Sequence, residues 1–170
     1  MPLSLAHLSE SEAAALVQQL LGKAFQQVNR VGGVSLHQTE VRDYRGSDEE
    51  LQAAALLDTD HHWTEVQDSW IEAFSRSGGL CFFDPIGLRY YLPAYMDWYM
   101  RKGKTHESNI TGTLLWRLSN AYVHNMTFDQ LFTPEQLTAI KTFLAYAAAH
   151  SPCDPEQAQA ILTAYERTGV

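Results

Sequence analysis

Between residues 88 and 100 nearly every side chain is apolar or aromatic. Two neighbouring stripes in this run follow a helical repeat: Tyr91, Tyr95 and Tyr99, and Leu92, Met96 and Met100. A helix that is apolar on almost all sides is stable only when other elements cover it. The run therefore predicts the central helix of a bundle, around which the remaining helices pack.

The ends of this helix are marked in the sequence. Asp84 can accept hydrogen bonds from the first free amides of the helix, and Pro85 fits its first turn. Pro93 lacks an amide hydrogen and crowds the preceding turn, so we expect it to kink the helix or to split it in two. Gly103 is the predicted end.

Helix-opening motifs recur along the rest of the chain. Capping residues stand before apolar positions at helical spacing at Ser9–Glu12, Ser47–Glu50, Ser69–Glu72, Thr133–Gln136 and Asp154-Pro155. A further helix is predicted over 111–119. The other segments are less regular: we expect irregular chain or a short strand over 34–47, a buried strand or linker at 80–83, and a loop over 120–129.

These patterns predict a mainly α fold, with about six or seven helices around one core and a minor short strand pair. A chain of 170 residues is the size of one ordinary domain, and 45% hydrophobic residues are enough for a real core. We therefore expect residues 1–170 to form a single globular domain.

The two cysteines, Cys81 and Cys153, are too few for a disulfide framework, and we expect both to be reduced and buried. No stretch reaches the roughly 18 apolar residues of a membrane helix. The first residues also lack the basic leader and apolar run of a secretion signal. The sequence therefore predicts a cytoplasmic protein with no membrane segment.

The charge of the chain is concentrated in one segment. The formal net charge is −8, from 20 acidic and 12 basic residues, which argues against binding of nucleic acid. Residues 40–72 contain ten acidic residues and two basic ones, Arg42 and Arg45, so this segment alone carries −8. One interpretation is a solvated face with acids at helix starts. The other is a docking surface for a basic protein partner.

The candidate binding residues of this acidic segment are Asp48, Glu49, Glu50, Asp58 and Asp60. Cations elsewhere in the chain bear on the docking interpretation. If Arg101, Lys102 and Lys104 neutralise the acids within the fold, that interpretation is weakened.

Asp58, His61 and His62 are the candidate metal ligands, because carboxylate and imidazole groups hold zinc or iron. Adjacent His61 and His62 cannot both point to one side of a helix, and paired Glu-x-x-His and His-Glu-x-x-His motifs are missing. The P-loop and Gly-x-Ser-x-Gly motifs are missing too. We therefore expect no metal and no cofactor.

The aromatic helix offers two further alternatives. Arg89, Tyr91 and Tyr95, together with acids from residues 40–65, are candidate residues of a pocket for a small ligand or an enzyme substrate. Such a pocket requires Arg89 and the tyrosine hydroxyls to converge. An exposed part of the same helix would instead form a homodimer interface.

Within the run Phe82–Met96, a Pro-x-Gly-x-Arg turn precedes Tyr91-Leu92-Pro93-Ala94-Tyr95. The run resembles the hallmark of a small uncharacterised bacterial domain family, an aromatic-Leu-Pro-Ala-aromatic segment after such a turn. Further matches are Gly33–Leu36, Asp43-Tyr44, Gly46–Glu50, Trp63–Val66 and Leu131–Gln136. The resemblance covers most of residues 33–145 and implies a bacterial, cytoplasmic protein. It brings no established activity, cofactor or catalytic residue.

The residues establish no function. The leading prediction is a non-enzymatic interaction module with an acidic docking face, which neutralises a basic protein as an antitoxin or an immunity protein does. The alternatives are a ligand binder or enzyme with its site near Arg89, and a structural homodimer.

Overall fold

The computed structural model describes residues 4–74, 79–103 and 109–170. Within these ranges the chain forms ten α-helices, one short 3-10 helix and one two-stranded antiparallel sheet. The elements in chain order are α1 (Glu10–Ala24), α2 (Leu36–Asp43), α3 (Asp48–Ala55), η1 (Trp63–Glu65), α4 (Asp68–Ala73), α5 (Gly79–Phe82), α6 (Pro85–Lys102), α7 (Ile110–Ser119), β1 (Tyr122–Val123), β2 (Met126–Thr127), α8 (Phe128–Leu131), α9 (Pro134–His150) and α10 (Pro155–Thr168). The expected mainly α fold with a minor strand pair is confirmed.

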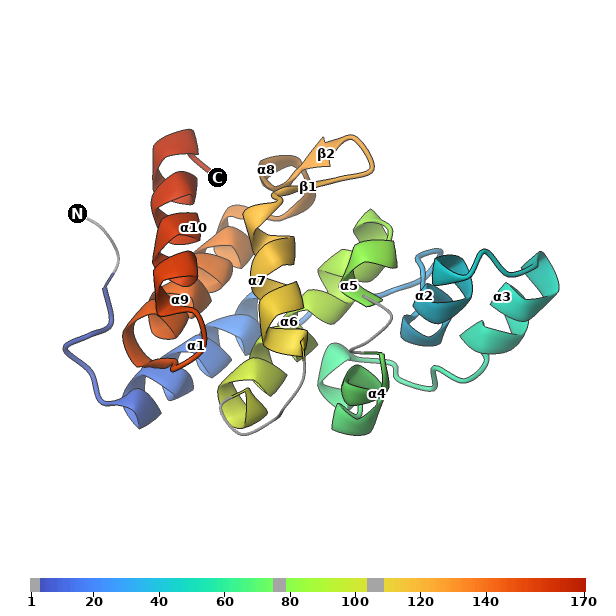
Figure 1. Cartoon of the computed structure of the whole chain (residues 1–170), viewed down its shortest axis with the longest axis horizontal. Helices are drawn as coiled ribbons and strands as arrows, with labels where there is room; N and C mark the ends of the chain where they lie inside the picture. The colour runs from blue at the N-terminus through green and yellow to red at the C-terminus, as the bar shows by residue number, and fades with distance from the viewer. Residues whose placement is uncertain (1–3, 75–78, 104–108) are drawn as a thin grey trace.

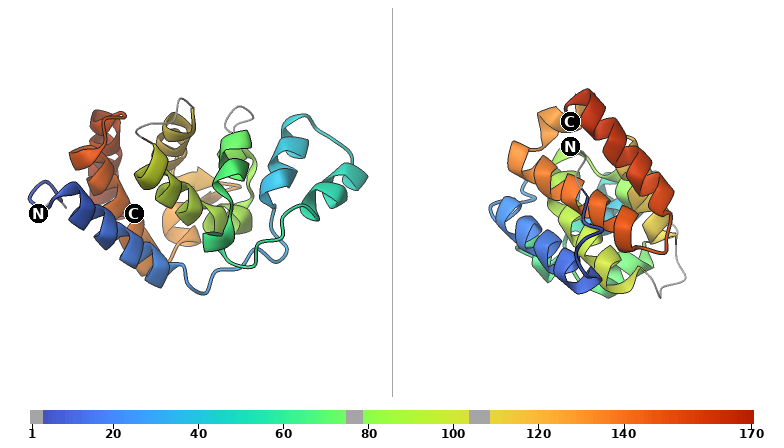
Figure 2. Two further views of the ribbon diagram at one scale, coloured as in Figure 1. Left: turned by 90° about the horizontal axis from the view of Figure 1, so that it is seen from below. Right: turned by 90° about the vertical axis from the view of Figure 1, so that its left-hand side faces the viewer.

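The elements are arranged in a row (Figures 1 and 2). The pair α9–α10 lies with α1 at one end, the pair α2–α3 lies at the other, and α6 lies between them. Helix α9 packs on both α10 and α1, whereas α2 packs on α3 and α5. Helix α6 contacts α1, α7 and η1, so it joins the two ends through the core.

Helix α6 is buried along almost its whole length, and Tyr90, Tyr91 and Trp98 are fully enclosed. We expected Pro93 either to kink the helix or to split it in two; the split does not occur, because α6 runs from Pro85 to Lys102 as one helix. An internal proline costs about 3 kcal/mol. Each large apolar side chain that α6 buries contributes about 1.5–3 kcal/mol, so packing outweighs the proline.

The segment around Leu36 is a helix, not the short strand that was expected. Val34, Ser35 and Leu36 are all buried, so the alternation over 34–36 was only apparent. Ser35 stands at the start of α2, where its amide donates to the side-chain oxygen of Gln38 at 2.9 Å. The buried Leu36 and Thr39, three residues apart, give this helix its inner face.

Three smaller expectations also need correction. Residues 79–82 form one helical turn, α5, rather than a strand. Helix α4 starts after Gln67, so Ser69 lies inside the helix and does not cap it. The expected loop over 120–129 contains the β1–β2 hairpin, whose turn residues His124 and Asn125 have φ values of 44° and 66°. Positive φ values at both turn residues give a turn that matches the right-handed twist of paired strands.

In residues 4–74, 79–103 and 109–170, no helix is both long and apolar enough to cross a membrane. Both cysteines are free thiols. The prediction that both are buried is wrong for Cys81, which is exposed, while Cys153 is partly buried. Leu80 and Phe83 occupy the inner side of α5 and its end, so Cys81 faces outward.

Candidate functional site

The ten acids of residues 40–72 separate into an inner and an outer group. Asp58 and Asp60 are buried, with exposed fractions of 6% and 4%, and Asp68 and Glu72 are partly buried. The other six are exposed: Glu40, Asp43, Asp48, Glu49, Glu50 and Glu65. The acidic segment is therefore not one continuous external face.

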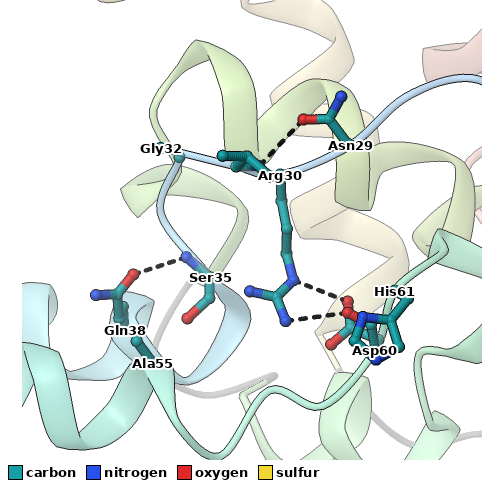
Figure 3. A pocket seen from close by; sticks show the side chains of 10 residues that line it. Asn29, Arg30, Gly32, Ser35, Gln38, Ala55, Asp60 and His61 are labelled. Atoms are coloured by element: carbon teal, nitrogen blue, oxygen red, sulfur yellow. Dashed lines mark hydrogen bonds and ion pairs between the residues drawn. The ribbon is translucent and has the colours of Figure 1, made fainter.

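Asp60 receives three donors on the same carboxylate oxygen. Its Oδ2 accepts from Arg30 Nε at 3.1 Å, from the Tyr90 hydroxyl at 2.7 Å and from the Tyr91 hydroxyl at 3.5 Å. Figure 3 shows Arg30 reaching across to Asp60. Burial, and then the nearby carboxylates, raise the pKa of both tyrosine hydroxyls, so both remain donors. A buried carboxylate is tolerated when it is compensated in this way.

Asp58 ties the start of α2 to the loop that follows α3. Its Oδ1 lies 2.7 Å from His37 Nδ1, and its Oδ2 accepts from the His37 amide at 3.0 Å. The His37 ring also meets Trp70 and Phe74 edge-on, with centroids 5.3 Å and 5.1 Å away. The Asp58 carbonyl accepts a further hydrogen bond from Arg30 Nη2. Asp58 and Asp60 therefore belong to one internal polar cluster.

The first turn of α6 positions this cluster. Asp84 Oδ1 accepts from the Gly87 amide at 2.8 Å and from the Val34 amide at 3.0 Å. A Cβ on Gly87 would lie 2.3 Å from the Val34 carbonyl oxygen, so only glycine allows the two backbones to approach this closely. The chain after α1 is thereby held against α6, next to Tyr90 and Tyr91.

Asp68 and Glu72 of α4 are neutralised by the end of α6. Arg101 Nη2 lies 2.8 Å from Asp68 Oδ1, and Lys102 Nζ lies 3.0 Å from Glu72 Oε1 and 3.2 Å from Asp68 Oδ2. The hydrogen bond from Arg101 lowers the pKa of Asp68 to about 2. Part of the acidic segment is therefore balanced within the fold; Lys104, the third cation expected here, lies outside the described residues.

The candidate pocket of Arg89 with the tyrosines is not assembled. Arg89 is half-buried and lines a separate hollow with Asn29 and Gln136. Tyr91 stacks on Phe83 with ring centroids 4.9 Å apart, and Tyr95 is buried in the core. The hydroxyl of Tyr91 turns to Asp60 and away from any shared opening with Arg89.

Five of the six exposed acids lie on α2 and α3, and these two short helices lie at one end of the molecule (Figure 1). We call this surface the acidic tip; it comprises Glu40, Asp43, Asp48, Glu49 and Glu50 with the exposed apolar residues Tyr44, Leu56 and Leu57. Ser47 and Glu50 form the expected capping box, in which Glu50 Oε2 accepts from the Ser47 amide at 2.7 Å. Leu56 is 82% exposed and Leu57 is 57% exposed. Asp48, Glu49 and Glu50 thus share a surface, but Asp58 and Asp60 do not belong to it.

The candidate metal ligands are not brought together. Asp58 faces His37, whereas the ring of His62 lies beside Thr64, with Nδ1 to Oγ1 at 2.8 Å, and His61 is exposed. Within the part of the chain that the structure describes, no three metal-ligating side chains gather at one point.

Sequence reasoning missed Arg30, Ser35 and Gln38. Arg30 comes just before Gly32-Gly33, and a lone cation at a tight turn gives no signal of a partner 30 residues further along the chain. Tyr90 is one of the tyrosines of residues 90–99 that were expected in a pocket near Arg89, but its hydroxyl donates to Asp60 instead. Only the folded chain brings these groups to the buried acids.

Fold and site together define a small, mainly α protein with a polar cluster under its central helix and an acidic end. The chain belongs to a family of unknown function, DUF6714, whose family model matches residues 13–166. No curated protein and no solved structure matches the chain.

Proposed function

We propose that the protein is a non-enzymatic interaction module that binds a basic protein through the acidic tip. The observation that carries this proposal is the concentration of five exposed acids and three exposed apolar side chains on α2, α3 and their connections. Acids steer a basic partner to the surface, and desolvated apolar anchors hold it there. The resemblance and the two free thiols support action in the cytoplasm of a bacterium.

The way α3 is held supports the proposal. Ala54 is the single buried residue of α3, and the helix packs mainly on α2. Leu56 and Leu57, which follow the end of α3, leave most of their surface exposed. Exposed apolar groups rimmed by charge are typical of surfaces that bind another protein.

The chemistry of the tip also describes the partner. A complementary surface carries lysine or arginine around a small apolar patch. Proteins that act on nucleic acid carry such basic surfaces, because they must neutralise phosphates. An antitoxin or immunity protein that covers the basic active surface of a nuclease-like toxin fits this description.

The homodimer alternative through the central helix has little surface to use. Within the described residues, the exposed or half-exposed positions of α6 are polar or lie at its first turn, and its rings are enclosed. Exposed Trp116 lies on α7 instead.

The test compares two variants that lose the same charge. The first, E40Q/D43N/E49Q, neutralises the tip but keeps Ser47 and Glu50, so the capping box stays intact. The matched control, D129N/E135Q/E156Q, removes three exposed acids from α8, α9 and α10. Partners are captured from the source cell by the tagged wild type at low salt, and each captured protein is then purified and titrated against all three chains by calorimetry.

The proposal predicts a partner whose affinity falls about tenfold or more for the tip variant, stays near wild type for the control, and falls steeply with salt. L56S/L57S should weaken the same complex without changing its salt dependence. If every purified partner binds the wild type and the tip variant equally, or if none binds the wild type directly, the proposal fails.

A further inference from the structure

A second feature lies at the base of the tip, on the side of Arg30 (Figure 3). Here a pocket of about 350 Å³ opens between the 29–33 loop, the start of α2 and the end of α3. Its volume is within the range of pockets that hold small molecules. In Figure 3, Arg30 and Asp60 lie on one side of this opening and Ser35 and Gln38 on the other.

Two buried polar atoms of residues that line this pocket have no hydrogen-bond partner. They are Ser35 Oγ and Asp60 Oδ1, and both residues are buried, with exposed fractions of 1% and 4%. A buried polar atom without a partner is unfavourable, so folded proteins rarely leave one. The three donors to Asp60 all reach Oδ2, so the carboxylate keeps one oxygen free.

The neighbouring groups are fixed in place, which makes the pocket preformed. Arg30 uses Nε on Asp60 and Nη2 on two carbonyl oxygens, while Nη1 has no hydrogen-bond partner among the described residues. Gln38 accepts from the Ser35 amide and donates to the Leu51 carbonyl at 3.0 Å. The pocket therefore offers two donors, the Arg30 guanidinium edge and the Ser35 hydroxyl, and one acceptor, the free oxygen Oδ1 of Asp60.

The charges around the pocket select the occupant. A simple anion would meet Arg30 but also the carboxylate of Asp60, and a simple cation would meet Asp60 but also Arg30. A molecule with both charges satisfies each side. We propose that this pocket binds a small zwitterion of the amino-acid class, with its carboxylate on Arg30 and Ser35 and its ammonium group on Asp60.

Ser35 and Asp60 need only small adjustments to make these contacts. Rotation about one side-chain bond turns the Ser35 hydroxyl toward the opening. The hydroxyl then leaves the Gln38 amide, which it faces in the capping box of α2 without a hydrogen bond of normal geometry. Binding then supplies partners for both orphan atoms, which is a gain that a fully satisfied pocket could not offer. This site is separate from the acidic tip and does not depend on the proposed function.

The experiment titrates the purified full chain with single proteinogenic amino acids, followed by calorimetry and thermal denaturation. Acetate, methylammonium and glycerol serve as probes that carry the anion alone, the cation alone, or neither. We expect saturable binding of at least one amino acid, and binding of the three fragments that is about tenfold weaker or worse.

Ser35→Ala is the decisive variant. Because Ser35 is also the N-cap of α2, the change should lower the melting temperature somewhat, so binding is measured well below the melting temperature of the variant. The change should weaken amino-acid binding about tenfold. Asp60→Asn keeps the shape of the side chain but removes the charge, and should abolish binding. The tip variant E40Q/D43N/E49Q should bind like the wild type.

Three results would each overturn the proposal. The first is that no amino acid binds at millimolar concentration. The second is that acetate or methylammonium binds as well as the best amino acid. The third is that Ser35→Ala, folded at the temperature of the titration, binds as tightly as the wild type.

Discussion

At the residue scale, the burial or exposure of each carboxylate decides whether it stabilises the interior or is available to a partner. Asp58 and Asp60 are neighbours in sequence to the acids of the tip, yet they serve the interior. Arg30, His37 and two tyrosines of α6 compensate them. The sequence indicated that acids were concentrated in residues 40–72, but it gave no sign of which ones face water, because their partners lie far away along the chain.

Gly87 is the residue where the fit is closest. We predict that Gly87→Ala lowers the free energy of unfolding by about 1–3 kcal/mol, because the added methyl group would meet the rigid Val34 carbonyl oxygen at 2.3 Å. Urea denaturation measures the change. Gly22→Ala in α1 is the control: a Cβ there meets no atom within 4 Å, and alanine favours the helix by about 0.5–1 kcal/mol. Equal effects at both positions would contradict this account.

Cys81 is exposed but should react slowly near neutral pH. Partial burial of its surroundings raises the pKa of the thiol, and Asp43 adds to this effect while Arg117 opposes it. Because the thiolate is the reactive form, alkylation by iodoacetamide should keep accelerating above about pH 9. The measurement uses the C153S variant, so that Cys81 is the single thiol. A rate that levels off at about pH 9 would show a thiol with an ordinary pKa, and one that levels off at a lower pH would show an activated thiol.

At the element scale, helices with a recognised cap or a clear apolar repeat could be predicted, including the short α3, whereas α2, α5 and α8 could not. Capping motifs and apolar spacing correctly indicated α1, α3, α6, α7, α9 and α10. Helix α2 was missed although Ser35 and Gln38 stand at the spacing of a capping box, because the apparent alternation of Val34 and Leu36 favoured an extended segment. The candidate pocket is formed by such short elements and loops, and this is why Arg30 and Ser35 were not identified from sequence.

The link between α4 and α6 should depend on pH. Asp68 has its pKa lowered to about 2, against about 3.9 for an unfolded aspartate, so its contribution to stability is complete above about pH 5 and is lost as the pH falls through 2. Asp68→Asn should therefore destabilise the protein by about 1 kcal/mol or less near neutral pH and by only a small part of that near pH 2. Urea denaturation of both proteins across this range checks the prediction. A difference that stays constant down to pH 2 would rule out the ion pair as its source.

At the scale of the whole molecule, packing is uneven along the row of helices. Helix α9 buries ten of its 17 residues between α1 and α10, whereas α3 buries only Ala54. Local stability follows the amount of buried apolar surface. The end with α9 is therefore the firm part of the fold, and the acidic tip is held more weakly.

Hydrogen exchange should reveal this difference. We predict that amides of α3 exchange through local opening at a much lower free energy than amides of α6 and α9, which exchange only on global unfolding. Exchange followed by mass spectrometry on peptides from each helix measures it. Addition of a purified tip partner should slow exchange in α3 first. Equal protection of α3 and α9 in the free protein would contradict the uneven packing.

Gln38 links the pocket to the acidic tip, because its side-chain amide bonds to Ser35 beside the pocket and to Leu51 in α3. Anything that stiffens one side of this bridge stiffens the other. If an amino acid in the pocket raises the affinity of the acidic tip for its protein partner, thermodynamic reciprocity requires that the bound partner raise the affinity of the pocket for the amino acid by the same factor. Gln38 would thus couple the concentration of a small molecule to the formation of a protein complex.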